Sequence, residues 1–260
     1  MDLREAAEAL GVHYQTAYAW ARDGTLPARK AGRSYEVSDA GVQALAARRR
    51  QGYEPRWAIR VRDWTAQAQA LYTAITGGEE TRARHQVGRL VSGVRIVDLC
   101  EEVIAPALRR VGDEWAAGRV SIAQEHRASA ICERLLASQI RQPAGRPRGT
   151  AVVATPPGER HGLPALMAAA CLREDRWLVH HLASDLPAAE VARLVDQVSA
   201  SLVVLSSATA EGARRVQEET RFLAVGRPDL NVLAGRPGDS LRGLLAQAGH
   251  PPAAGQGPRA

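Results

Sequence analysis

Apolar positions in the first fifty residues fall at helical spacing in short runs, each ended by a glycine. LREAAEALG, residues 3–11, predicts one short helix, and HYQTAYAWARDG, residues 13–24, predicts a second. TLPARKAGRSYEV, residues 25–37, holds two extended pieces around a glycine, which predicts a hairpin, and Ser38 or Asp39 can cap a third helix. Helix, tight turn, helix and hairpin together are typical of a winged helix-turn-helix.

Between residues 57 and 141 the apolar positions keep a helical period throughout. The first stripe steps by three and four through Trp57, Val61, Trp64, Ala68, Leu71 and Ile75. Two further stripes follow, and Ser121 with Gln124 has the spacing of a capping box at the start of another helix. Helices of this kind predict an antiparallel four-helix bundle.

The hydrophobic period shortens after residue 149. Short β-rich runs, TAVVA, RWLVHHLA, SLVVLSS and LNVLAG, alternate with helical stretches at 161–174, 187–198 and 210–225. This alternation predicts a parallel sheet with right-handed crossovers, in a flavodoxin-like, doubly wound domain. No clear fifth strand follows the last helical stretch, so we expect a trimmed sheet.

The fold class expected for the whole chain is therefore multidomain, α and α/β. The expected units are a winged helix-turn-helix over 1–52, a four-helix bundle over 56–142, a parallel-sheet domain over 149–249 and a disordered tail over 250–260.

Composition adds little to this picture. A net charge of +6 permits a polyanionic partner without requiring one. Three scattered cysteines without a CxxC pair fit a reducing, cytoplasmic setting and argue against a disulfide scaffold or zinc finger. No apolar run is long enough to cross a membrane.

The pattern REAAEALGV…T.Y.W.RDG.LPA.K.GR.Y.V in residues 4–37 resembles the winged helix-turn-helix of the excisionase and MerR families, and so implies binding to double-stranded DNA. The basic candidates for phosphate contact are Arg22, Arg29, Lys30 and Arg33. The candidates for base contact, early on the second helix, are Tyr14, Gln15, Thr16 and Tyr18. A small protein-interaction domain with a solvated basic edge is the alternative.

The loop PPGERHGLP, residues 156–164, leaves the first expected strand at the edge where open α/β sheets bind ligands. Glu159 can accept an imidazole N–H from His161 and fix its tautomer, as carboxylates do beside metal-ligating histidines. Two solvated polar residues are the alternative.

The segment VGDEWAAGRVSIAQEHRAS, residues 111–129, and this loop together resemble the cobalamin-binding photoreceptor regulators of the CarH/LitR type. The positions that match the family's W…SVAxEH run are Trp115, Ile122, Glu125 and His126. Glu159 and His161 match its (D/E)xHxxG motif, whose histidine is the lower cobalt ligand. Ser206, Ser207 and Gly235 match positions along the channel for the nucleotide tail of the cofactor.

This resemblance implies a DNA-binding regulator, not an enzyme, with cobalamin (adenosylcobalamin above all) held between bundle and sheet domain. It also implies a homo-oligomer, a dimer or tetramer, whose assembly or DNA affinity depends on the upper cobalt ligand and on light. His161 would hold the cobalt from the sheet side, and Trp115, Ile122 and Glu125 would surround the upper ligand.

Three positions depart from the family pattern. Pro164 and Ala234 replace glycines, and Ala116 stands where light-sensing members commonly carry a histidine that binds cobalt after photolysis. These departures leave two alternatives open. One is a regulator with no cobalamin or with another small ligand, and the other, which the helix-turn-helix disfavours, is a corrinoid carrier for methyl transfer.

Overall fold

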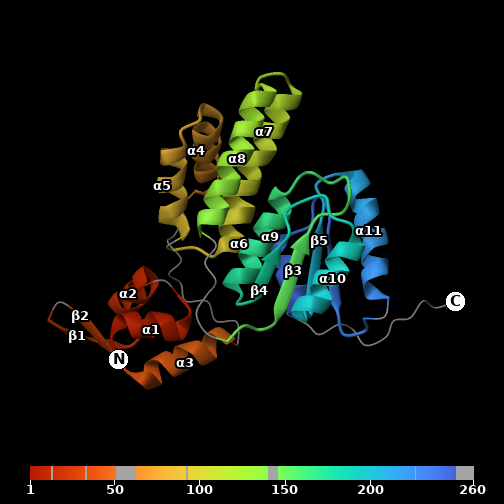
Figure 1. Cartoon of the computed structure of the whole chain (residues 1–260). Coiled ribbons are helices and arrows are strands. Elements are labelled where there is room, and N and C mark those ends of the chain that lie inside the picture. Colours follow the sequence, from red (N-terminus) through yellow and green to blue (C-terminus); the bar gives the residue numbers. More distant parts are fainter. Residues whose placement is uncertain are drawn as a thin grey trace.

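The computed structural model describes residues 1–12, 14–32, 34–50, 63–91, 93–139, 146–225 and 227–249. The elements follow one another in three groups: a small helix-turn-helix with a hairpin, a bundle of helices, and a sheet covered by helices (Figure 1). The sequence predicts linkers at GYEPR, 52–56, and QPAGRPRG, 142–149. The first linker, residues 142–145 of the second and the expected tail lie outside the described residues.

The first group forms as the glycine spacing predicts. Its elements are α1 (Leu3–Leu10), α2 (Tyr14–Asp23), β1 (Ala28–Ala31), β2 (Ser34–Val37) and α3 (Asp39–Arg50). Asp2 starts α1 with a capping box, Gly11 ends it in the left-handed conformation, and Ser38 caps α3 by accepting from the backbone N–H of Gly41 at 3.1 Å. β1 and β2 pair antiparallel as the expected hairpin.

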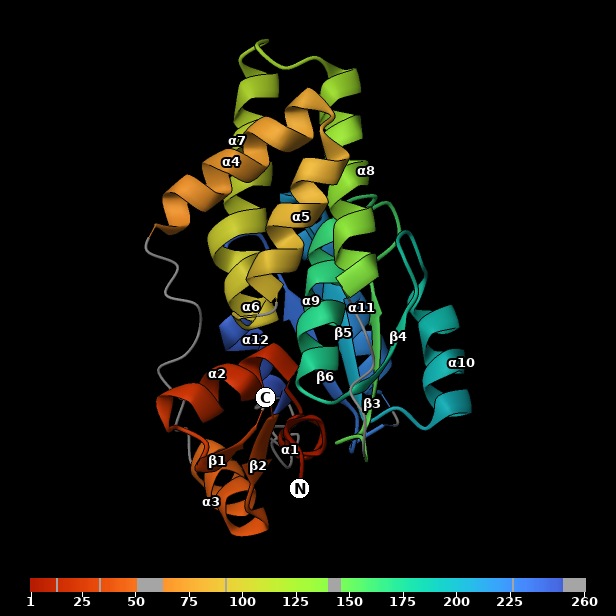
Figure 2. The ribbon, with the colours of Figure 1, turned by 90° about the vertical axis from the view of Figure 1, so that its left-hand side faces the viewer.

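The second group is the bundle, in which the long helices lie side by side (Figure 2). Its elements are α4 (Trp64–Gly77), α5 (Glu80–Val91), α6 (Ile96–Leu99), the π-helix η1 (Cys100–Ile104), α7 (Ala105–Ala116) and α8 (Ile122–Gln139). The start of the first helix is later than the stripe predicts, because Asp63 is extended and caps α4. The stripe positions before it lie outside the described residues. The capping box of Ser121 and Gln124 is confirmed.

The third group is a parallel sheet with strand order β4-β3-β5-β6. Its elements are β3 (Thr150–Ala154), α9 (Leu163–Glu174), β4 (Leu178–His181), α10 (Ala188–Val198), β5 (Leu202–Ser206), α11 (Ala210–Ala224), β6 (Asn231–Gly235) and α12 (Leu241–Ala248). This is the predicted flavodoxin-like order without a fifth strand among the described residues, so the predicted α and α/β fold class is confirmed.

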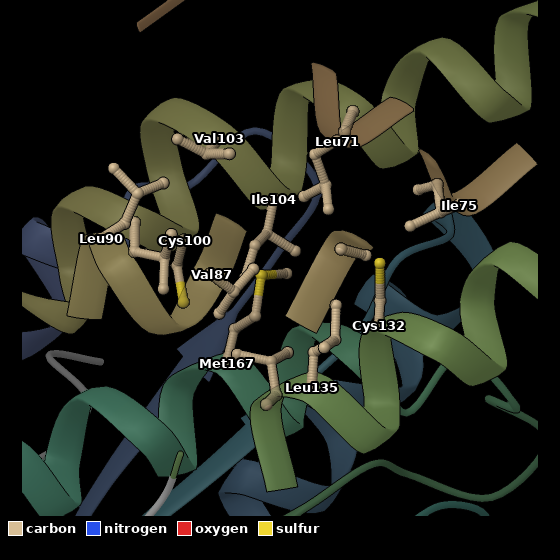
Figure 3. Close-up of a cluster of buried hydrophobic side chains, with 14 of the residues drawn as sticks. Leu71, Ile75, Val87, Leu90, Cys100, Val103, Ile104, Cys132, Leu135 and Met167 are labelled. Carbon is tan, nitrogen blue, oxygen red and sulfur yellow. The ribbon is translucent and has the colours of Figure 1, made fainter. Parts of the chain in front are cut away.

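Bundle and sheet share one helix, α9. Together with α12 it covers one face of the sheet, while α10 and α11 cover the other. On its outer side α9 belongs to the core of the bundle, where Met167 lies among Val87, Ile104 and Leu135 (Figure 3). α7 and α8 project beyond the carboxyl ends of the strands (Figure 1). The bundle therefore stands beside the sheet and overhangs the edge where the strand-to-helix loops lie.

Candidate functional site

Two loops meet at the carboxyl edge of the sheet, after the neighbouring strands β3 and β5. β3 leads into α9 on one face of the sheet, and β5 leads into α11 on the other face. A reversal of this kind leaves a crevice in which ligands bind. Residues 155–162 and 207–209, which follow the two strands, lie at this position.

Glu159 and His161 form the pair that the loop sequence predicted. Glu159 Oε1 lies 2.6 Å from His161 Nδ1 and accepts the backbone N–H of His161 at 2.9 Å. A carboxylate only accepts hydrogen bonds, so Nδ1 carries a proton, and in the neutral form of the ring Nε2 is the nitrogen with the lone pair. The side chain of His161 is 63% exposed, whereas that of Glu159 is 1% exposed. A buried carboxylate thus orients an exposed imidazole, the arrangement found behind metal-ligating histidines.

The second carboxylate oxygen of Glu159 is held by the start of α11. Oε2 accepts from the backbone N–H groups of Ala208 and Thr209, at 3.0 and 3.2 Å, and from Thr209 Oγ1 at 3.0 Å. Burial alone would raise the pKa of Glu159, but the hydrogen bonds from His161, Ala208 and Thr209 together lower it below its ordinary value. The carboxylate is therefore ionised at neutral pH, at the end of a helix where negative charge is stabilised.

Two glycines make room for this network. A Cβ at Gly212, in the first turn of α11, would lie 2.5 Å from Glu159 Oε2. Gly158 has a φ of +79°, and a Cβ there would lie 2.5 Å from Nη1 of Arg215, which donates to the carbonyl of Pro157 at 2.8 Å. At Gly212 an added side chain would displace the held carboxylate, and at Gly158 the left-handed backbone favours glycine.

Pro164, the first departure from the family motif, does not disturb the loop. It lies in the first turn of α9, directly after Leu163, where the missing N–H costs no helical hydrogen bond. The pairing of Glu159 with His161 forms with the proline in place.

The three candidates for the tail of a ligand lie on β5, on β6 and just after β5. Ser206 and Ser207 are buried, at 5% and 3% exposure. Ser207 donates to the carbonyl of Gly235 through its backbone N–H at 2.9 Å and through Oγ at 3.3 Å. The three residues are therefore brought together by the pairing of β5 with β6.

The candidates on the bundle lie at its overhanging end. Trp115, near the end of α7, is 49% exposed and Ile122, at the start of α8, is 60% exposed, so packing within the bundle does not explain either side chain. One turn into α8, Glu125 is held by Nδ1 of His126 at 2.7 Å and by Oγ of Ser129 at 2.9 Å. An apolar wall and an oriented carboxylate thus share one end of the bundle.

The candidate DNA-binding residues lie on α2 and the hairpin. Tyr14, Tyr18, Arg22, Arg29 and Lys30 are exposed and Thr16 is half-buried. The side chain of Gln15 and the whole of Arg33 lie outside the described residues.

An aromatic contact joins the two elements. The rings of Tyr14 and Tyr18 lie 6.4 Å apart, and Tyr18 meets Tyr35 of β2 edge-on at 5.6 Å. Tyr35 is a residue that the sequence reasoning missed, although its place in the hairpin was predicted.

Three further observations concern metal binding, cysteine reactivity and membrane spanning. The described residues contain no group of three or more His, Cys, Asp and Glu side chains that could hold a metal ion. The cysteines at 100, 132 and 171 are free and buried, and burial raises the pKa of Cys132 to about 12, so it is not a reactive thiol. No helix in the described part of the chain is long and apolar enough to span a membrane.

Comparison with known proteins gives the class. A family model described as a helix-turn-helix domain matches residues 1–50, and one described as a B12 binding domain matches residues 67–138. The chain therefore combines a DNA-reading domain type with a cobalamin-binding domain type, as a cobalamin-binding transcriptional regulator does.

The chain is also similar to individual proteins of known identity. The chain is 27% identical over 251 residues to the HTH-type transcriptional repressor CarH of Myxococcus xanthus, with 86% of this chain and 84% of that protein covered. The monomethylamine corrinoid protein of Methanosarcina barkeri is similar in fold, with a TM-score of 0.51 at 15% identity over 64% of this chain and 81% of that one. The resemblance to CarH-type cobalamin-binding regulators is thus confirmed.

Proposed function

We propose that this chain is a cytoplasmic, light-responsive transcriptional regulator without enzymatic activity, whose signal is adenosylcobalamin. In this proposal residues 1–52 bind double-stranded DNA, residues 56–142 form the cover over the cofactor and residues 149–249 hold it from below. The observation that carries the proposal is the Glu159–His161 pair, an exposed imidazole held through Nδ1 by a buried, ionised carboxylate.

The residues on both sides fit a corrin. Below, Nε2 of His161 would coordinate the cobalt, and Ser206, Ser207 and Gly235 would line the path of the nucleotide tail. Above, Trp115 and Ile122 would cover the upper ligand, and Glu125 would accept hydrogen bonds from the hydroxyl groups of that ligand. The exposure of these two apolar side chains supports this role, because a bound ligand would remove them from water. When bound, the cofactor supplies a cobalt–carbon bond that light cleaves.

Ala116 shapes the proposed response. It stands next to Trp115 at the end of α7 and offers no donor to cobalt. In this proposal Trp115, Ile122 and Glu125 would sense the upper ligand through direct contacts, and Ala116 would add no metal ligand to them, so the signal would be the loss of these contacts. The bundle would then shift against the sheet domain and change the dimer or tetramer.

A reconstitution experiment tests the proposal. The protein is incubated with adenosylcobalamin in the dark, desalted and examined by absorbance, beside His161→Ala and the control His85→Ala, which removes an exposed histidine of α5. We expect a coloured complex for the wild type and the control, and a weaker complex with a shifted spectrum for His161→Ala. A colourless wild type would reject cobalamin and favour another small ligand.

A further inference from the structure

The β4–α10 loop, residues 182–187, supports the His161 loop from the side opposite α11 and has no role in the sequence motifs. Its backbone contains two non-glycine residues in the left-handed region, Ala183 at φ +60° and Asp185 at φ +66°. Such conformations are strained for residues other than glycine and are retained where surrounding contacts enforce them. The hydrogen bonds of Asp185 to the His161 loop are the contacts that offset this strain.

Asp185 is bonded to the His161 loop at two points. Its Oδ1 accepts the backbone N–H of Gly158 at 2.7 Å. Its own backbone N–H donates to Oγ1 of Thr155 at 2.9 Å, and this hydroxyl donates to the carbonyl of Glu159 at 2.8 Å. Thr155 is fully buried, so its hydroxyl has no water to replace these partners. Asp185 thereby fixes the backbone directly before and at Glu159.

The left-handed conformation is what makes both bonds possible. It directs the N–H of Asp185 back toward the end of β3 while its carboxylate reaches the turn at Gly158. Asparagine adopts this conformation readily and keeps an acceptor oxygen, whereas glycine adopts it without strain and has no acceptor. The two substitutions therefore separate the carboxylate's hydrogen bond from the backbone shape.

We propose that Asp185 is a positioning residue for the cobalt ligand: through Gly158 and Thr155 it sets the position of Glu159, and through Glu159 the orientation of the His161 imidazole. This inference rests on the proposed function, since it concerns the coordination of cobalamin. Removal of a residue that supports a metal ligand from behind costs about 10–100-fold in affinity in other metal sites.

The test compares the dissociation constant for adenosylcobalamin and the absorbance spectrum of the bound cofactor among variants of the full chain. We expect Asp185→Gly to weaken binding about tenfold and to shift the spectrum toward that of His161→Ala. Asp185→Asn should restore the wild-type spectrum. Ala183→Gly, the matched control in the same loop, relieves a left-handed alanine whose methyl group carries no hydrogen-bonding atom, and it should leave both readouts unchanged.

Thr155→Val breaks the same relay without substituting a residue of the β4–α10 loop. It covers the case in which Asp185→Gly does not fold, and it should give the same spectral shift. The inference is overturned if Asp185→Gly or Thr155→Val binds with the wild-type constant and spectrum while His161→Ala does not. If His161→Ala itself matches the wild type, the proposed cobalt ligation fails and the inference falls with it.

Discussion

At the scale of single residues, the candidate site depends on how tightly one carboxylate is held. Glu159 is buried and has partners on both oxygens, so His161 has one tautomer and one orientation. The sequence predicted this pair, because both residues lie in one loop. It could not predict Thr209 or Asp185, because they reach the loop from 50 and 27 positions away in the chain and only the sheet order brings them there.

Gly212→Ala tests this packing without changing a polar group. The new Cβ would lie 2.5 Å from Glu159 Oε2, so the carboxylate must move and pull His161 with it. We expect a loss of about 1–3 kcal/mol in the free energy of unfolding, measured with urea, and weaker cobalamin binding. Gly88→Ala in α5, where a Cβ meets nothing within 4 Å, is the control and should be neutral or slightly stabilising. Equal free energies of unfolding and equal cobalamin affinities for the two variants would contradict this role of Gly212.

The two basic residues of strand β1 point to opposite faces of the hairpin. Lys30 is paired across the strands with Tyr35, which contacts Tyr18 of α2, whereas Arg29 is paired with Glu36 and forms an ion pair with it at 3.0 Å. Neighbours along a strand point to opposite faces, so Lys30 lies on the face that continues the tyrosines of α2.

Lys30→Ala should therefore reduce DNA affinity more than Arg29→Ala. For Lys30→Ala, we expect the slope of the logarithm of the DNA association constant against the logarithm of the salt concentration to decrease in magnitude by about one, as for the loss of one phosphate contact. Fluorescence anisotropy with a DNA duplex at several salt concentrations measures the affinity of each variant and its salt dependence. A larger loss for Arg29→Ala would place the DNA on the opposite face of the hairpin.

At the scale of elements, local signals predicted ends and caps well and packing decided the rest. Gly11, Ser38 and Ser121 mark helix boundaries as their sequences indicate. The π-helix η1 between α6 and α7 was not predicted, because a shift of the hydrogen-bond register within an apolar stripe leaves no mark on the spacing. This segment is also where the bundle meets α9 and α12.

Arg242 ties α12 to that part of the bundle. Its guanidinium bonds Asp98 of α6 at 2.7 Å and also contacts Glu101 and Glu102 of η1. Arg242→Ala should lower the free energy of unfolding by about 1 kcal/mol, more at low salt, because three carboxylates lose a shared partner. Arg193→Ala, which breaks an exposed pair within α10, is the control and should change little. Equal losses in urea unfolding would show that the contact between α12 and the bundle adds no stability.

At the scale of the whole molecule, the bundle is anchored at one end and unsupported at the other. Its base packs on α9, while the ends of α7 and α8 that carry Trp115 and Ile122 project past the sheet (Figure 1). The order of the three groups was predictable, since short glycine-ended helices with a hairpin, a long helical stretch and a strand-helix alternation follow one another in the sequence. The overhang was not, because it depends on the packing of α9 against both neighbours.

The proposed response to light belongs to this scale. The adenosylcobalamin complex should change its elution volume in size-exclusion chromatography after illumination, because loss of the upper ligand removes contacts to the overhanging end. The complex with methylcobalamin, which lacks the large upper ligand, should elute in the dark like the illuminated sample. An unchanged elution volume with cobalamin still bound would contradict a light-dependent change of oligomeric state. DNA affinity would then be the regulated property.

The coordination of cobalt by His161 is the central claim, and electron paramagnetic resonance tests it most directly. The protein is produced with histidine labelled in its ring with the heavy nitrogen isotope, and the paramagnetic cobalt(II) form of the cofactor is bound. The account predicts that labelling changes the nitrogen splitting on the cobalt lines from triplets to doublets, and that His161→Ala abolishes this change. Triplets that persist in the labelled wild type would mean that the cofactor keeps its own base on cobalt, and would contradict the account.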